Sequence, residues 1–188
     1  IWMNEESANA LLKVMEEPPE GVLFLLTADS LAGVLPTIRS RCISFAVAPV
    51  SPEDCARYCT AQGVGAKDAA LYSALFDGHI GTVLAAARDE ARREQVDRAL
   101  ALAKAAAARD SYAAAVLLAA YEKDKAGASA LLADFRAVAA AGLRDSSHSP
   151  VEGETARKAL GAADAAMQQI SAQVNPKIVL SVLAAKLG

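Results

Sequence analysis

An arginine in a short polar turn is the strongest candidate for chemistry in this sequence. Arg41 lies between Ser40 and Cys42. A planar guanidinium keeps its charge and offers fixed N–H donors that can bridge the oxygens of a phosphoryl group. Taken alone, the residues favour an ordinary solvated arginine in a loop, which is also how we interpret Arg39.

The other reactive side chains give weaker signals. Cys42 has no histidine near it in sequence, which favours a small packed residue over a nucleophile. Cys55 and Cys59 are one helical turn apart, but a metal site would need two further ligands. His79 and His148 stand alone in unrelated contexts. We therefore expect packed thiols and no metal site.

The residues before Arg41 predict a helix followed by a buried strand. Asn4 can cap this helix, and Pro18-Pro19 stops it. Its apolar face would comprise Ala8, Leu11, Leu12 and Met15. The apolar run 22–26 has the length of a strand buried on both faces of a parallel sheet. A buried core helix is the rival interpretation, but the run is too short for one.

Two further elements are expected around Arg41. Ser30 can cap a short helix that Pro36 ends. After Arg41, the residues Ile43, Phe45 and Val47 alternate with smaller ones, as in a half-buried strand. The turn that contains Arg41 would then connect a helix with a strand.

Three runs in this region resemble the bacterial clamp-loader subunits of DNA polymerase III, which belong to the AAA+ superfamily. They are NALLKVMEEPP at 9–19, LFLLTAD at 23–29 and LPTIRSRC at 35–42. The resemblance implies that the chain begins just after the nucleotide-binding half. It gives Thr27 the sensor-1 position beside the γ-phosphate, although Thr27 could equally be a strand-end threonine that caps the next turn. It also matches Ser40, Arg41 and Cys42 to the family's SRC motif, whose arginine reaches into the neighbouring subunit's ATP site.

The segment after Pro49 predicts three short helices. Ser51-Pro52 is a strong helix start, and this helix should end near Gly63. A second helix is expected at about 67–76, and a third begins near Gly81. Together they resemble the small lid domain of an AAA+ module.

The lid holds the feature that best separates members of this family. Gly81 occupies the position at which the ATPase subunits carry their sensor-2 arginine, and glycine there resembles the δ′ type. His79 and Ile80 depart from the Ser-Pro pair that is usual in δ′. His79 could contact phosphate, but we favour a neutral residue at a helix cap.

From residue 88 onward the sequence predicts nearly continuous helix. The expected segments are 88–108, 111–124, 127–144, 154–173 and 176–187. They resemble the C-terminal collar of clamp-loader subunits. In the last helix, Ile178, Val182 and Leu183 would face inward. We therefore predict a mainly α chain in three parts: the back half of an AAA+ α/β domain (1–48), a lid (49–87) and a helical collar (88–188).

Composition excludes several classes of protein. The net charge of −3 and the pI near 5.4 argue against a free-standing DNA-binding domain. Three cysteines, an odd number, fit a reducing compartment. The sequence has no run of about twenty apolar residues, which a membrane-spanning helix would need. Its first residues do not resemble a signal peptide. We expect a cytoplasmic protein with no membrane partner.

The predicted function is that of a δ′-like clamp-loader subunit that donates Arg41 in trans while the sliding clamp is loaded in DNA replication. Its implied partners are the γ/τ and δ subunits, with the clamp and primer-template DNA reached through the assembled complex. It would need no cofactor itself, because ATP-Mg is bound by its neighbours. It would be non-catalytic alone, as part of a DNA-directed DNA polymerase holoenzyme.

Two alternatives remain open. One is a fragment of a γ/τ-type ATPase subunit, which Gly81 makes less favourable. The other is a purely helical scaffold for assembly. An independent ATPase is nearly excluded, because the sequence contains no GxxxxGK[ST] phosphate loop.

Overall fold

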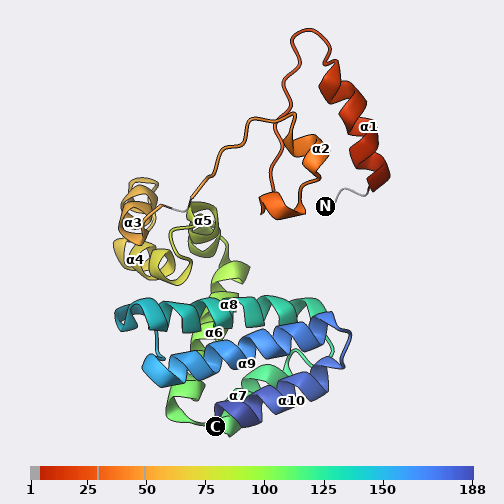
Figure 1. Ribbon diagram of the computed structural model, residues 1–188. Helices are drawn as coiled ribbons and strands as arrows, with labels where there is room; N and C mark the ends of the chain where they lie inside the picture. The colour runs from red at the N-terminus through yellow and green to blue at the C-terminus, as the bar shows by residue number, and fades with distance from the viewer. Residues whose placement is uncertain (1–4, 29, 49) are drawn as a thin grey trace. The chain divides into compact units, whose positions relative to one another are not determined.

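The computed structural model describes residues 5–28, 30–48 and 50–188, which fall into two compact units, Ile1–Ala48 and Pro49–Gly188 (Figure 1). The described residues form helices, turns and irregular segments and contain no strand. The prediction of a mainly α protein is confirmed.

The first unit contains two α-helices and one short turn of 3₁₀ helix. Helix α1 spans Glu5–Glu16, η1 spans Leu31–Gly33 and α2 spans Pro36–Arg39. Residue Asn4, the predicted cap of α1, lies outside the described residues. The hydroxyl of Ser30 accepts a hydrogen bond from the Ala32 amide at 3.2 Å and so caps η1.

Pro36 corrects one prediction about this unit. It was expected to end a helix, but it occupies the first position of α2. Proline suits that position, because the first amide of a helix has no intrahelical partner and the proline φ angle is already helical. Ile38 of α2 is buried, so this short helix has an apolar anchor.

Neither predicted strand forms in the first unit. Residues 22–28 and 43–48 are irregular in the structure. Five apolar residues are each more than 80% exposed: Leu23, Leu25, Ile43, Phe45 and Val47. A strand needs a hydrogen-bonded neighbour, and no described segment supplies one. The strand predictions were therefore wrong for the described residues.

The second unit begins with three short helices. Helix α3 spans Pro52–Ala61, α4 spans Ala66–Leu75 and α5 spans Ile80–Arg88. The predicted start of α3 is confirmed, since the Ser51 hydroxyl accepts a hydrogen bond from the Asp54 amide at 3.1 Å. Helix α4 packs against both α3 and α5.

Five further helices complete this unit. They are α6 (Glu90–Ala108), α7 (Ser111–Ala119), α8 (Lys125–Arg144), α9 (Gly153–Ser171) and α10 (Pro176–Leu187), with η2 at Ser146–His148. In Figure 1, α8 and α9 lie side by side, and α7 lies beside α10. Gly127, predicted as a break, lies in the first turn of α8, which Asp124 caps through the Gly127 amide.

The core of the second unit combines large apolar residues with many alanines. Its largest fully buried side chains include Phe135, Leu102, Leu131, Leu132, Ile170, Leu180 and Leu183. The predicted inward register of α10 was only partly right: Leu183 is buried, but Ile178 and Val182 are exposed. Val179 and Leu180 occupy the inner face, because α7 and α9 both pack against α10.

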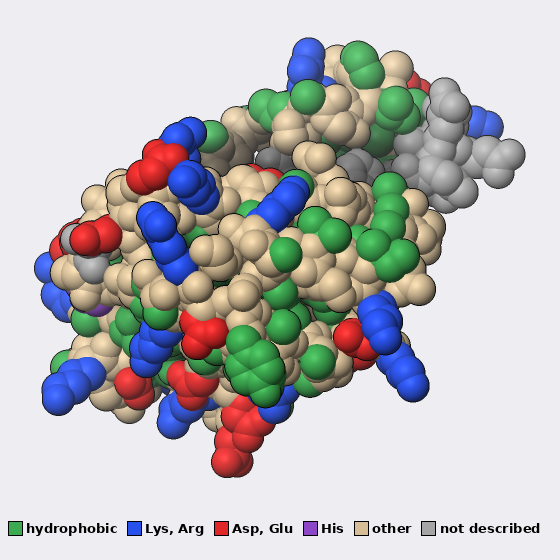
Figure 2. Space-filling model, turned by 90° about the horizontal axis from the view of Figure 1, so that it is seen from below, with side chains coloured by type: hydrophobic (Ala, Val, Ile, Leu, Met, Phe, Trp, Pro, Cys, Tyr) green, Lys and Arg blue, Asp and Glu red, His purple; other side chains and the backbone are tan. Residues whose placement is uncertain are grey.

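Helix α8 is long and apolar enough, by length and composition alone, to cross a membrane. Half of its apolar stretch is buried inside the molecule, where it packs against α6 and α9. A core helix of a soluble protein passes the same test. On the face drawn in Figure 2, acidic and basic side chains are interspersed among apolar ones.

Candidate functional site around Arg41

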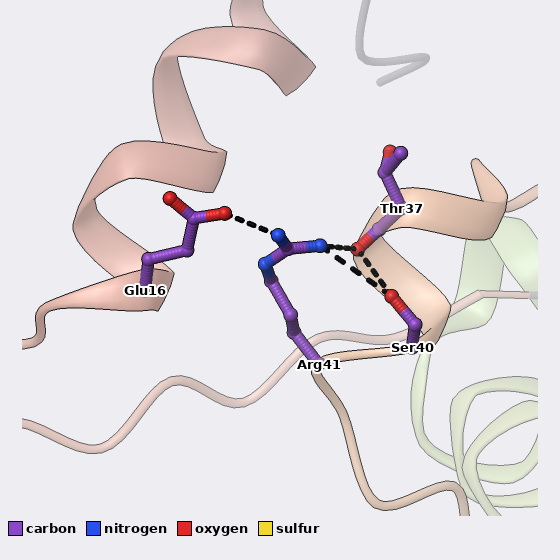
Figure 3. Close-up of polar contacts among 4 residues, drawn as sticks. All are labelled: Glu16, Thr37, Ser40 and Arg41. Carbon is purple, nitrogen blue, oxygen red and sulfur yellow. Dashed lines mark hydrogen bonds and ion pairs between the residues drawn. The ribbon is translucent and has the colours of Figure 1, made fainter.

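Arg41 lies one residue beyond the end of helix α2. Ser40 caps this helix, and the Arg41 amide donates a hydrogen bond to the Ile38 carbonyl at 3.0 Å. The Arg41 side chain turns back over the helix end (Figure 3). Its Nη1 donates to the Thr37 carbonyl oxygen at 2.9 Å and lies 3.4 Å from the Ser40 hydroxyl.

The last turn of α2 therefore holds one side of the guanidinium. The Ser40 hydroxyl also donates to the Thr37 carbonyl, at 3.0 Å, so two donors converge on a single backbone oxygen. Carbonyl groups at the end of a helix lack intrahelical partners and carry partial negative charge. A cationic side chain is a favourable partner there.

The other side of the guanidinium is paired with a carboxylate. Nη2 of Arg41 forms a charged hydrogen bond with Oε1 of Glu16, the last residue of α1 (Figure 3). The exposed fractions of the two side chains are 35% and 49%. The site thus joins the ends of two helices through residues 25 apart in sequence, and it remains open to solvent.

Part of the guanidinium stays free. Among the described residues, the Nε–H of Arg41 has no hydrogen-bond partner. A half-exposed guanidinium with a free donor can still bind an oxyanion. The arrangement suits an arginine that is held in place while one edge points to a ligand.

The other predicted site residues are not joined to Arg41 by polar contacts. Thr27 is exposed in an irregular segment, and Cys42 is half-buried next to Arg41 in sequence. No hydrogen bond or ion pair links either side chain to Arg41 in the described part of the chain. Gly81 is the second residue of α5 and belongs to the second unit.

His79 and the cysteine pair have local partners. Nδ1 of His79 donates to the Phe76 carbonyl at 2.7 Å, so its ring is held at the start of α5 without capping a free amide of that helix. Cys55 and Cys59 are fully buried. Burial raises the pKa of the Cys59 thiol. The described residues include no group of three metal-ligating side chains.

Sequence reasoning missed two members of the Arg41 site. Thr37 contributes only its backbone oxygen, which any residue would supply. Glu16 contributes a charge, but nothing in the local pattern connects it with an arginine 25 residues later. The one available signal was its opposite charge in a run, 9–19, that accompanies the SRC motif.

The comparisons with known proteins found a family model and several relatives. Residues 2–51 match the family model described as "DNA polymerase III, delta subunit". The DNA polymerase III subunit gamma of Buchnera aphidicola is 42% identical over 52 residues, which cover 28% of this chain and 14% of that protein. The subunit delta′ of Haemophilus influenzae is 58% identical over 40 residues, 21% of this chain and 12% of that protein.

A third relative is matched over a longer stretch. The subunit gamma/tau of Mycobacterium tuberculosis is 42% identical over 65 residues, which cover 32% of this chain and 11% of that protein. The matched segments thus span only about an eighth of the lengths of these relatives. No solved structure matches the chain. Residues 2–51, which include the whole Arg41 site, are thus similar to the DNA polymerase III delta-subunit family, and the chain shares short stretches with DNA polymerase III delta′ and gamma/tau subunits.

Proposed function

We propose that this protein is a δ′-like subunit of the DNA polymerase III clamp loader and that it donates Arg41 to the ATP site of a neighbouring subunit. The observation that carries this proposal is the Arg41 site itself. The SRC triplet lies inside the matched segment, and its guanidinium is held by the Thr37 carbonyl on one side, paired with Glu16 on the other, and still partly exposed to solvent. That combination suits an arginine that acts on a ligand held by another chain.

The chemistry of phosphoryl transfer supports this role. Negative charge spreads over the equatorial oxygens in the transition state, and a planar guanidinium can stabilise it with paired N–H donors. An arginine supplied by a partner also makes hydrolysis depend on correct assembly. The γ/τ-type neighbour would hold ATP-Mg, and this chain would supply only the arginine.

One feature supports a subunit that does not hydrolyse ATP by itself. Gly81 stands at the sensor-2 position, and a Cβ added there would meet nothing within 4 Å. Packing around the Cβ position therefore does not require glycine here.

The proposal includes the partners and the cellular place of such a subunit. Helices α6 to α10 would assemble it with γ/τ and δ subunits, and the complete complex would hold the sliding clamp and primer-template DNA. All of these partners act in the cytoplasm. Within such a complex the chain would be part of the polymerase holoenzyme without a catalytic centre of its own.

A γ/τ-type ATPase subunit is the second candidate, and a specific observation favours it. The match to a gamma/tau subunit extends over 65 residues, more than the 40 residues matched in a delta′ subunit. ATP binding by this chain does not separate the candidates, because its sequence has no phosphate loop in either case. The coding sequence upstream of residue 1 separates them: an intact GxxxxGK[ST] loop there would favour a γ/τ-type subunit, and a degenerate one would favour a δ′-like subunit.

The trans-acting role of Arg41 can be tested in a reconstituted complex whose other finger arginines have been removed. Arg41→Ala should reduce DNA-stimulated ATP hydrolysis by at least about ten-fold, since such arginines contribute roughly 10³–10⁵ in GTPases. Arg41→Lys should rescue poorly, because an ammonium group cannot make paired planar contacts. Arg39→Ala is the matched control, since it removes an exposed arginine two residues away.

Assembly must be measured in the same samples by size-exclusion chromatography with light scattering. The role is refuted if Arg41→Ala leaves hydrolysis unchanged while the complex assembles normally. An equal loss of activity with Arg39→Ala would also refute it, because the effect would then come from general charge.

A further inference from the structure

The Glu16–Arg41 ion pair has a consequence for how the arginine becomes available. A guanidinium that is paired with a carboxylate is electrically neutralised as seen by an approaching anion. The same carboxylate repels the phosphate groups that the arginine would contact. An arginine in this state is held in place, but its charge is already partnered within its own chain.

We propose that Glu16 is a counter-ion that the neighbouring subunit's triphosphate must displace before Arg41 engages it. This inference rests on the proposed trans-acting role of Arg41. The exchange breaks one charged hydrogen bond, between Nη2 and Oε1 of Glu16, and replaces it with hydrogen bonds to phosphate oxygens. Because ATP carries several negative charges, it is the stronger partner.

The position of Arg41 does not depend on Glu16 alone. Nη1 is held by the Thr37 carbonyl and lies near the Ser40 hydroxyl, and both groups belong to the turn that carries Arg41. Removing the Glu16 charge leaves these contacts intact. Glu16 therefore acts mainly as a competitor for the charge of Arg41, and its loss should make the arginine more available.

The exposure of the pair sets the size of the effect. The side chains of Arg41 and Glu16 are 35% and 49% exposed. An ion pair this exposed should change the equilibrium constant for nucleotide engagement by no more than about five-fold. Such a shift suits an exchange that must remain reversible. It also predicts an effect on the affinity for nucleotide and not on the chemical step, because the pair is already broken once Arg41 has engaged.

The test uses full complexes in which hydrolysis depends on Arg41 alone. Glu16→Gln keeps a hydrogen-bond acceptor but removes the charge, and it should lower the KM for ATP by about two- to five-fold with kcat changed by less than about two-fold. High salt should reduce the difference from the parent, since screening weakens the pair in the parent. Glu17→Gln, which removes an exposed charge at the next residue, is the matched control and should leave KM unchanged.

A positioning role for Glu16 would give a different pattern. In that case Glu16→Ala would lower kcat, and Glu16→Gln would retain it through the remaining hydrogen bond. This result overturns the inference, as does an unchanged or increased KM with Glu16→Gln. The proposed trans-acting role is tested separately by Arg41→Ala, and it fails if that variant keeps full activity. If Arg41→Ala loses activity as expected but Glu16→Gln leaves KM unchanged, only the counter-ion role of Glu16 is refuted.

Discussion

The ion pair between Arg92 and Asp134 should stabilise the second unit far more than the other ion pairs of α8. Arg92 of α6 donates from Nη2 to Oδ1 of Asp134 on α8 at 2.7 Å, and Nη1 binds the second carboxylate oxygen. Its Cζ atom lies 5.4 Å from the centre of the Phe76 ring, just after α4. The hydrogen bonds with Asp134 raise the pKa of Arg92. One side chain thus connects three segments of the unit.

The two partners differ in their access to water, and this predicts an asymmetry. The Asp134 side chain is only 6% exposed, whereas that of Arg92 is 22% exposed. Arg92→Met leaves a buried carboxylate without its partner, which should cost about 3–5 kcal/mol of unfolding free energy. Asp134→Ala leaves an arginine whose head can turn toward water, so its cost should be smaller, about 1–3 kcal/mol.

Urea titration of the full chain, followed by circular dichroism at 222 nm, measures both costs. Arg136→Ala is the matched control, because it breaks another pair between α8 and α9 whose side chains are 50% and 44% exposed. That variant should lose less than about 1 kcal/mol. The double variant of Arg92 and Asp134 should be more stable than Arg92→Met alone, since no unpaired charge remains.

The three losses of unfolding free energy, ranked by size, test whether burial of the Asp134 carboxylate sets the cost. If Arg92→Met costs no more than Arg136→Ala, the pair is not desolvated in solution and the argument from burial fails. If Asp134→Ala costs more than Arg92→Met, then the hydrogen bonds themselves, and not the unpaired charge, dominate. A change in the slope of the urea transition would show that the variant exposes a different amount of surface on unfolding or no longer unfolds in two states.

Two further predictions concern local structure. Gly142→Ala should lower the unfolding free energy by about 1–3 kcal/mol, because its Cβ would lie 1.9 Å from the Val151 carbonyl oxygen. Gly161→Ala should instead raise the unfolding free energy by up to about 1 kcal/mol, because a Cβ there would have open space around it. Thermal melts of the two variants should therefore shift in opposite directions, and a shared direction would contradict the packing argument. The pKa of Asp145 is lowered by hydrogen bonds from the Ser147 amide and hydroxyl. Its contribution to stability is therefore present above the ordinary carboxyl pKa and is lost as pH falls through the lower folded value, so Asp145→Asn should flatten the stability profile below the ordinary carboxyl pKa.

The sequence determined the parts of this protein that depend on near neighbours. The start of α3 follows from Ser51 and Pro52, and the start of α10 follows from Asn175, whose side chain accepts a hydrogen bond from the Lys177 amide at 3.0 Å. Such caps involve groups two or three residues apart, so the sequence contains both partners. The SRC triplet likewise identified Arg41 and Ser40, which contact each other within one helical turn.

Only the tertiary structure decided which residues meet across longer separations. The apolar runs at 22–26 and 43–47 have the composition of strands, but a strand requires a partner, and none lies among the described residues. Helix α10 has apolar residues around much of its circumference, so its pattern could not fix the inner face; packing against α7 and α9 buried Leu180 and left Val182 exposed. The pairing of Arg41 with Glu16 was invisible for the same reason, because an ion pair depends on the distance between two helix ends and not on their spacing in the chain.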